Sequence, residues 1–417
     1  MYKLEFTLKQ HTPIIHFQHD QEGATLRATE VKPKLDRFLY ENRDRLDYPY
    51  FRENVSNPYS MKIVNTQKST ILEGIENFSA GDSNSIPLVL SNMGKHNDEI
   101  SKFSWIDSDL KLIIKTAHKK LLSDIQFIFP EFLFYTNFGS RSSKGFGSFY
   151  LSEECEYYVD LNEYDESFYF DVTFKSRNEV IENCKSLFKY INTLHKAIRS
   201  GIQEGFFDKR TQKFKTTFYL KSVLWLYSNT FAIQWDKKTI KTQLLGLKSN
   251  NEPLNNKFLI KELLGLSTLE KWNIIKEKDS EETLDRNIEI KREHDCTSEA
   301  EKIERIPSPF IYKPIKTTDG EIRVYLIPKG DFVLSDNQKF KISVTKPSPK
   351  SILLPLATSK FNIKGYFNFM FKPKSNGEYI FEIKDLVDEK LLHNNLKHDT
   401  LILLEDVFKQ VRRNAKK

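Results

Sequence analysis

The most constraining feature of this chain is the stretch Gly139–Gly147, GSRSSKGFG, which contains three of its 15 glycines. Glycine adopts backbone conformations that other residues avoid, so the chain can turn sharply and direct successive N–H groups inward. Arg141 and Lys144 add positive charge suited to phosphate oxygens, and Phe146 offers a flat ring suited to a base. The stretch therefore favours a polyphosphate ligand over a metal ion, with an ordinary solvated hairpin turn as the alternative.

The segments around this loop decide which phosphate-binding architectures are possible. Apolar residues over Ser108–Leu122 form a helical stripe, whereas the aromatic segment Ile125–Phe138 and the segment Gly147–Leu151 are typical of strands. The sequence thus predicts that the loop joins two strands. Dinucleotide-binding and nucleoside-triphosphate loops open a helix and have other glycine spacings, so both classes are excluded.

Length and charge give broader limits. A chain of 417 residues predicts two or three domains. The net charge is +7, but residues 276–305 hold 11 acidic and 7 basic side chains, a net of −4, which leaves +11 on the remainder. This distribution permits a polyanionic partner without requiring one. We expect 276–305 to be an exposed helix or a disordered linker.

The compartment and the cofactors are predicted mainly from what the sequence does not contain. No apolar run approaches the roughly 20 residues that span a bilayer, and the first residues, MYKLEFTLKQ, do not resemble a secretion signal. Three widely separated cysteines predict neither a disulfide framework nor a zinc site. We therefore expect a cytoplasmic protein with no cofactor, no bound metal and no membrane partner.

The N-terminal segment predicts a strand followed by a helix. Leu4 and Phe6 alternate with polar residues over Lys3–Thr7, as in a half-buried strand. Because proline lacks the N–H that a helix interior needs, Pro33 places the helix start near Lys32. The free N–H groups there would form an anion site beside three cations, which are Arg27, Lys32 and Lys34.

Further along the chain the same order of strand and helix recurs. Phe168–Phe174 alternates like a strand, and Ser176 with Glu179 forms a capping box for a helix that Gly201 ends. Two partly degenerate βαββαβ modules would account for this order. The remaining predictions are an irregular insertion at 50–104, strands within 214–235, 310–314, 322–327, 340–344 and 365–371, and a helix at 400–411.

The histidines are the candidate catalytic groups. His11, His16 and His19 cluster near the N-terminus, with Asp20 beside the last. Their spacing matches no strong metal-ligand template, and they carry either acid–base ribonuclease chemistry or a structural role. We predict no catalytic residue, and keep a metal-independent endoribonuclease using His16 or His19 as the alternative.

Three segments together resemble the RAMP superfamily, the repeat-associated proteins of CRISPR systems. GSRSSKGFGS resembles its glycine-rich loop, and TPIIHFQHDQEGATLRATEVKPKLDRFL resembles its early strand and following helix. RIPSPFIYKP resembles a strand entry in the first subunit of the Cmr effector complex, although its prolines also suit a rigid linker. This chain has Pro33 where the family usually has glycine, and LDRFL where a tryptophan-rich helix end is usual.

The resemblance implies an α+β fold of two ferredoxin-like (RRM-like) modules with antiparallel sheets, at 1–152 and 153–417. It implies a non-catalytic subunit of a type III CRISPR effector complex that contacts other RAMP subunits and the 3′ region of the guide RNA, the target RNA or both. A scaffold whose loop binds a neighbouring protein is a further alternative. The implied RNA-binding residues are Arg27, Lys32, Lys34, Arg37, Gly139, Arg141, Ser142, Ser143, Lys144, Gly145, Phe146 and Gly147.

Overall fold

A computed structural model provides the structure of this chain, and by compactness it divides into two units. The first comprises Met1–Val89, Asp98–Ile191 and Ile311–Ile327, and the second is made mainly of 192–310 and 328–417. The structure describes residues 1–15, 25–64, 70–75, 86–87, 101–105, 109–173, 180–208, 210, 213–234, 236–246, 257–266, 268–278, 281–296, 302–317, 320–330, 338–344, 349–388 and 398–415.

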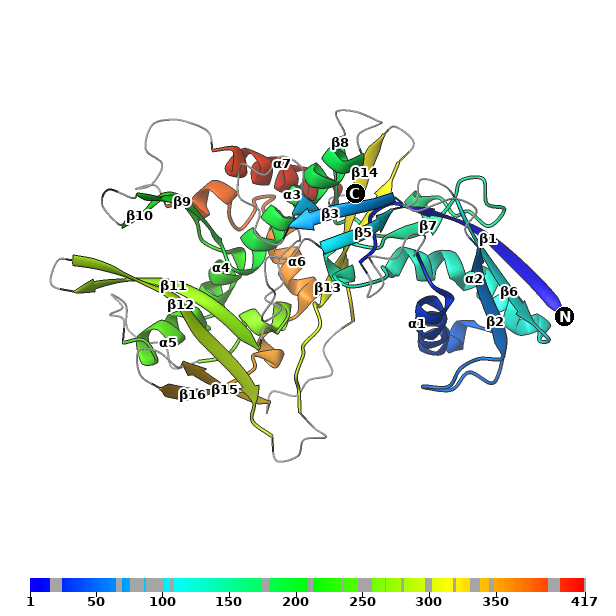
Figure 1. The fold of residues 1–417 in the computed structure, drawn as a ribbon, viewed down its shortest axis with the longest axis horizontal. Coiled ribbons are helices and arrows are strands. Elements are labelled where there is room, and N and C mark those ends of the chain that lie inside the picture. The colour runs from blue at the N-terminus through cyan, green and yellow to red at the C-terminus, as the bar shows by residue number, and fades with distance from the viewer. Residues whose placement is uncertain are drawn as a thin grey trace. The chain divides into compact units, whose positions relative to one another are not determined.

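A four-stranded antiparallel sheet is the frame of the first unit (Figure 1). Its strands stand in the order β2-β6-β1-β7, and the chain connects them as β1-α1-β2-β6-α2-β7. Residues from both helices share one apolar core with the sheet. The bounds are β1 Tyr2–Gln10, α1 Ala28–Glu41, β2 Tyr59–Val64, β6 Leu110–Thr116, α2 Lys119–Tyr135 and β7 Phe149–Leu151.

Buried residues occur at every second position in the two central strands. Leu4 and Phe6 of β1 are buried, which confirms the predicted first strand. In β6, Leu110, Leu112 and Ile114 are buried in the same way. The predicted helix over 108–122 is therefore wrong for its first half, because a period of two had been interpreted as a helical stripe.

Helix α2 replaces the strand predicted at 125–138. Its buried side chains include Ile125, Ile128, Phe132 and Leu133, whereas Lys120, Ser123 and Phe127 lie on an exposed face. The many aromatic residues of the helix, which favour strands, masked this helical pattern. Pro130 lies inside the helix, which was a further signal against it. The glycine-rich loop consequently joins a helix to a strand, and the prediction that it joins two strands is wrong.

Helix α1 begins earlier than predicted. Its first residue is Ala28, and Pro33 lies within it despite lacking an N–H. Burial of Val31, Leu35 and Leu39 against the core offsets that loss, since each side chain is fully enclosed. Lys32 is therefore inside the helix, and the anion site predicted at a helix start beside it is wrong.

The segment predicted as an irregular insertion contains regular structure. Strand β2 belongs to the main sheet, where Tyr59 pairs with Thr116. The remaining strands form a small sheet of their own, in the order β4-β3-β5. They are β3 Thr70–Ile75, β4 Ile86–Pro87 and β5 Ser101–Trp105.

A third sheet in the first unit joins segments far apart in the sequence. Its order is β13-β14-β8, with β8 Tyr169–Thr173, β13 Phe310–Lys316 and β14 Glu321–Pro328, and all three strands match predictions. Helix α3, Val180–Arg199, follows β8, and Gly201 turns the chain after it with φ +82°. The predicted capping residues Ser176 and Glu179 lie outside the described residues.

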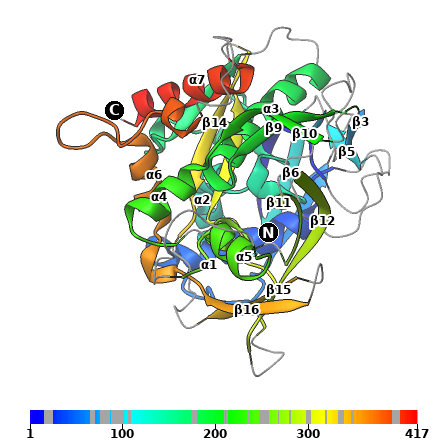
Figure 2. The ribbon, with the colours of Figure 1, turned by 90° about the vertical axis from the view of Figure 1, so that its left-hand side faces the viewer.

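The second unit is built around the antiparallel sheet β11-β12-β15-β16 and the hairpin β9-β10 (Figure 2). Residues 276–305 were predicted to be an exposed helix or a disordered linker, and this prediction is wrong. Most of them belong to strands β11 and β12. They form a strand because Ile288, Ile290 and Arg292, at alternating positions, are buried. Helices also replace predicted strands at α4 and α6, while α7 confirms the last predicted helix. The bounds are β9 Ile202–Asp208, β10 Lys213–Leu220, α4 Val223–Thr230, α5 Asp236–Gln243, β11 Leu269–Lys278, β12 Glu281–His294, β15 Lys339–Val344, β16 Lys350–Pro355, α6 Ile363–Phe371 and α7 Asp399–Asn414.

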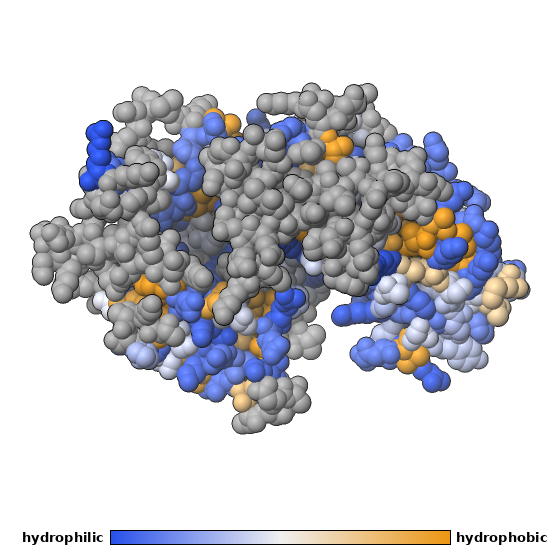
Figure 3. Space-filling view, in the orientation of Figure 1, coloured by the Kyte–Doolittle hydropathy of each residue, from blue (hydrophilic) through white to orange (hydrophobic). Residues whose placement is uncertain are grey.

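The chain is thus a mixed α and β protein with several antiparallel sheets. Hydrophilic residues cover much of the coloured surface in Figure 3, with smaller hydrophobic patches between them. Within the described residues, no helix is both long and apolar enough to span a membrane.

Candidate nucleic-acid interface

The glycine-rich loop is held at its base by backbone hydrogen bonds to the segment after β1. The N–H of Gly147 donates to the Pro13 carbonyl at 2.8 Å, and the N–H of Ser140 donates to the Ile15 carbonyl at 2.6 Å. Thr12 adds a side-chain bond, from its hydroxyl to the Gly145 carbonyl at 2.6 Å. The loop is therefore closely attached to the core.

Other backbone segments pack so closely against both ends of the loop that only glycine fits there. Gly139 and Gly147 have φ of +77° and +64°, in the left-handed region. A Cβ on Gly139 would lie 2.4 Å from the Ile15 carbonyl oxygen, and one on Gly147 would lie 1.9 Å from that of Phe138. These glycines allow backbone to pack on backbone, which is a structural use of the motif.

The tip of the loop has a different geometry from its base. Arg141 and Gly145 are both left-handed, with φ of 56° and 90°, and they bracket a single 3₁₀ turn over Ser142–Lys144. Among the described residues, the N–H groups of Ser142 and Ser143 have no protein acceptor. All four residues from Arg141 to Lys144 are half-buried. The tip thus combines two cations with donors suited to an anion.

Glu30 on α1 connects the loop to the helix and was not predicted as a site residue. Its carboxylate accepts the N–H of Gly139 and also the Lys34 ammonium at 3.0 Å. The ammonium donates as well to the Asn137 carbonyl at 3.1 Å. The only sequence signal for this arrangement was the spacing of four between Glu30 and Lys34 on a helix.

Asn137, which was also not predicted from the sequence, holds the tip of the loop in place. Its side-chain amide donates to the carbonyls of Ser142 and Tyr312, both at 2.8 Å. Asn137 therefore links Lys34 to the loop tip by hydrogen bonds to both. Nothing in the sequence around Asn137 marks it for this role.

Three of the predicted RNA-binding residues, Gly145, Phe146 and Gly147, are buried. The ring of Phe146 stacks on Phe188 of α3 with centroids 4.0 Å apart, so in this structure it packs on protein. A Cβ on Gly145 would meet Ile191 and Pro314 at 3.0 Å. These three residues position the loop, and the base-stacking role predicted for Phe146 does not fit its location.

The basic residues in and just before α1 that were predicted to bind RNA lie in different surroundings. Lys32 donates to Asp36 at 3.1 Å and to the Asn57 carbonyl at 2.9 Å, with its ammonium 3.7 Å from the Tyr59 ring centroid. The structure therefore brings Lys34, but not Lys32, to the loop. Arg27 is the half-buried residue before the helix, and Arg37 is exposed and paired with Glu41 at 2.7 Å.

His11 has a structural role. It is buried, and its Nδ1 accepts the backbone N–H of Lys316 at 3.0 Å. Burial, reinforced by Lys313 and Lys316, holds the pKa of His11 well below its ordinary value, so the ring stays neutral. His16, His19 and Asp20 lie outside the described residues. Among those that are described, no group of three or more His, Cys, Asp or Glu side chains could hold a metal ion.

Lys313 is a buried lysine that was not predicted from the sequence as part of the site. Its ammonium donates to the carbonyls of Thr136, at the end of α2, and of Phe149 on β7, both at 2.9 Å. Burial holds its pKa well below the usual lysine value. The residue ties together the two elements that flank the glycine-rich loop, and a lone lysine in an apolar strand was its signal.

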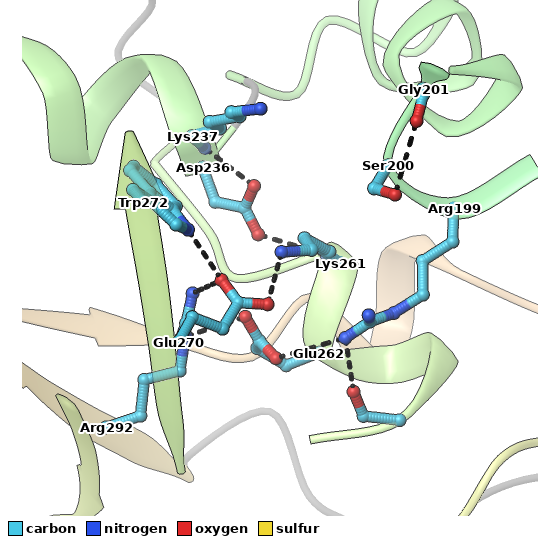
Figure 4. Close-up of polar contacts among 11 residues, drawn as sticks. Arg199, Ser200, Gly201, Asp236, Lys237, Lys261, Glu262, Glu270, Trp272 and Arg292 are labelled. Carbon is cyan, nitrogen blue, oxygen red and sulfur yellow. Dashed lines mark hydrogen bonds and ion pairs between the residues drawn. The ribbon is translucent and has the colours of Figure 1, made fainter. Parts of the chain in front are cut away.

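The second unit contains a buried cluster of charges (Figure 4). Arg292 contacts Glu262 at 2.7 Å and Glu270 at 3.0 Å, and Lys261 contacts Glu270 at 2.5 Å. Arg199 approaches Glu262 at 3.9 Å. Each charge of this network has an opposite charge within 4 Å, as buried charges require.

The pKa values of the two carboxyl groups in this cluster shift in opposite directions. Burial raises the pKa of Glu262 despite the nearby Arg292. Burial also opposes ionisation of Glu270, but Lys261 and Arg292 together hold the pKa of Glu270 well below its usual range. Both carboxyls are enclosed by protein and lie beside cations.

Comparisons with known proteins identify the family. A model of the Cmr1 N-terminal domain matches residues 1–202, and a model of the Cmr1 C-terminal domain matches residues 219–397. No curated protein matches the chain. A solved structure, apo Cmr1 from Pyrococcus furiosus, is similar over 80% of this chain and 90% of its own, with 10% identity and a TM-score of 0.27. A TM-score this low carries no argument, so the assignment rests on the two domain models, and by them the chain belongs to the Cmr1 family of RAMP-type proteins of type III CRISPR systems.

Proposed function

We propose that this chain is a non-catalytic RNA-binding subunit of a type III CRISPR effector complex, and that the loop tip Arg141–Lys144 contacts the RNA backbone. Family membership supports the place in the complex. The observation that carries RNA binding is the tip itself, where two cations flank two N–H groups without a protein acceptor. Such donors recognise phosphate and carry no base preference.

The architecture around the tip supports this proposal. A rigidly held site loses less conformational freedom on binding than a flexible loop does. Backbone bonds to Pro13 and Ile15 fix the base of the loop, and Asn137 fixes its tip. We propose further that β1-α1-β2-β6-α2-β7, with sheet order β2-β6-β1-β7, forms a ferredoxin-like module, as its βαββαβ order suggests. The second such module and the boundary at 152 stay predictions.

The set of RNA-contacting residues is narrower in this proposal than in the sequence prediction. Arg141, Ser142, Ser143 and Lys144 are the contacts, with Lys34 beside them through Asn137. Gly139, Gly145, Phe146 and Gly147 act by shaping the loop. The roles of Arg27, Lys32 and Arg37 toward RNA stay predictions.

Replacement of both tip cations tests the proposal. We expect Arg141→Ala/Lys144→Ala in the full chain to weaken binding of single-stranded RNA at least about tenfold, measured by fluorescence anisotropy. The matched control is Lys111→Ala/Lys115→Ala, which removes two exposed lysines of β6 in the same unit. Equal RNA affinity in both variants contradicts the proposal. Intact RNA affinity with lost assembly into the complex favours the scaffold alternative.

A further inference from the structure

A pocket of about 580 Å³ in the second unit has no role in the function proposed above. It lies between the last turns of α7 and the segment Tyr379–Lys384, and α7 is the red helix in Figure 2. This volume is within the range of sites that enclose a small organic ligand. The lining residues are Tyr379, Glu382, Ile383, Lys384, Glu405, Phe408, Lys409, Arg412 and Arg413.

Arg412 makes the aromatic wall of this pocket rigid. Its guanidinium donates to the carbonyls of Met370 and Phe381 and to the Glu382 carboxylate, at 3.2, 2.6 and 2.7 Å. The guanidinium carbon also lies 4.0 Å from the ring centroid of Tyr379. Because Arg412 is buried and held by three acceptors, it fixes the ring and is not itself the ligand-binding cation.

The charge that remains around the pocket is positive. Lys384, Lys409 and Arg413 are exposed, and they come from both sides of the opening. Glu382 is neutralised by Arg412 at 2.7 Å, which leaves Glu405 as the other carboxylate of the lining. Three cations beside one carboxylate, next to an aromatic ring, suit a ligand that carries both an anion and a planar group.

We propose that this pocket binds one nucleotide of a single-stranded RNA, with its base against Tyr379 and its phosphate at Lys384 and Lys409. An acidic peptide would use the cations but not the half-buried ring of Tyr379, so a nucleotide accounts for more of the lining. The inference rests on the proposed RNA-binding function, but it places a second contact in the other unit of the chain.

Charge reversal at the pocket tests this proposal in the full chain. The probe is a fluorescein-labelled oligouridylate of about 12 nucleotides, within the span of single-strand binding sites. We expect Lys384→Glu/Lys409→Glu to weaken binding at least about tenfold, because two phosphate contacts are lost and like charges are introduced. The matched control, Lys360→Glu/Lys364→Glu, reverses two exposed lysines outside the pocket and should bind more tightly than the pocket variant.

The ring is tested separately, with circular dichroism as the check on folding. We expect Tyr379→Ala to weaken binding about tenfold and Tyr379→Phe to restore it, since a phenyl ring still stacks. Wild-type affinity in the pocket variant, together with weak binding in Arg141→Ala/Lys144→Ala, overturns this inference and leaves the proposed function standing. Wild-type affinity in both variants overturns both. Normal RNA affinity with lost binding to partner subunits shows a protein-docking surface and also overturns the inference.

Discussion

The ring of Phe146 lies on the ring of Phe188, with their centroids 4.0 Å apart and their planes inclined by 10°. Both rings are fully buried. The contact joins the glycine-rich loop to helix α3 within the first unit. The one aromatic residue of the loop therefore packs in the protein core.

The first prediction follows from this stack. We expect Phe146→Ala to lower the free energy of unfolding by about 4 kcal/mol, as is usual for a buried Phe replaced by Ala. RNA affinity measured below the unfolding transition should change little. The control is Phe127→Ala, whose side chain is 62% exposed and whose loss should cost less than about 1 kcal/mol. A large loss of RNA affinity in a fully folded Phe146→Ala protein would indicate that the Phe146 ring contacts RNA.

The second prediction concerns Gly147 and separates steric contact from backbone strain. Gly147 and Gly246 have nearly the same φ, +64° and +67°, but a Cβ on Gly246 would meet nothing within 4 Å. We expect Gly246→Ala to cost about 1 kcal/mol, the strain of a left-handed alanine. Gly147→Ala should cost several times more, because its Cβ would overlap the Phe138 carbonyl. Equal losses in urea denaturation would show that the close backbone approach is absent.

The third prediction concerns the buried charges around Arg292. We expect Arg292→Met to lower the free energy of unfolding by about 3–5 kcal/mol, because Glu262 and Glu270 then stay buried with less compensation. Adding Glu262→Gln should recover part of this loss. Arg37→Ala, which breaks an exposed pair with Glu41, should produce no measurable change. Failure of the second substitution to recover any stability would argue against direct coupling between Arg292 and Glu262.

The fourth prediction is a pH dependence from His11. Its pKa is lowered on folding by burial, so below about pH 6.5 the unfolded chain binds a proton that the folded chain does not. The free energy of unfolding should therefore fall as the pH drops from 6.5 toward the folded pKa. Asn offers an acceptor oxygen near the position of Nδ1, so His11→Asn should keep the bond from Lys316 and reduce this slope. An unchanged slope in denaturant titrations across this range would assign the effect to other groups.

Sequence patterns predicted several strands, including β1, but not β6, where Ile113 interrupts the alternation of apolar residues. Leu4 and Phe6 marked β1 correctly because one face of that strand is buried. Helix α2 was taken for a strand, because it is rich in aromatic residues, which favour strands. In β12, charged residues masked the inward alternation of Ile288 and Ile290.

The unusual backbone of the glycine-rich loop was predictable from the sequence, but its contacts were not. Gly139–Gly147 was correctly identified as structurally special, yet its glycines serve close backbone packing. Glu30 and Asn137 contribute contacts across more than 100 residues of sequence, and no local pattern reports such partners. The pairing of Lys32 with Asn57 and Tyr59 depends in the same way on a strand distant in sequence.

The dependence of RNA affinity on salt tests the central claim most directly. Each phosphate contact on a single strand contributes about 0.7 to the slope of log affinity against log salt concentration, so the loss of Arg141 and Lys144 should reduce that slope by about 1.4. The variant Arg141→Ala/Lys144→Ala would be compared with wild type and with Lys111→Ala/Lys115→Ala on the same oligouridylate. The account predicts a reduced slope for the loop variant alone. Identical slopes for all three proteins would contradict phosphate binding at the loop tip.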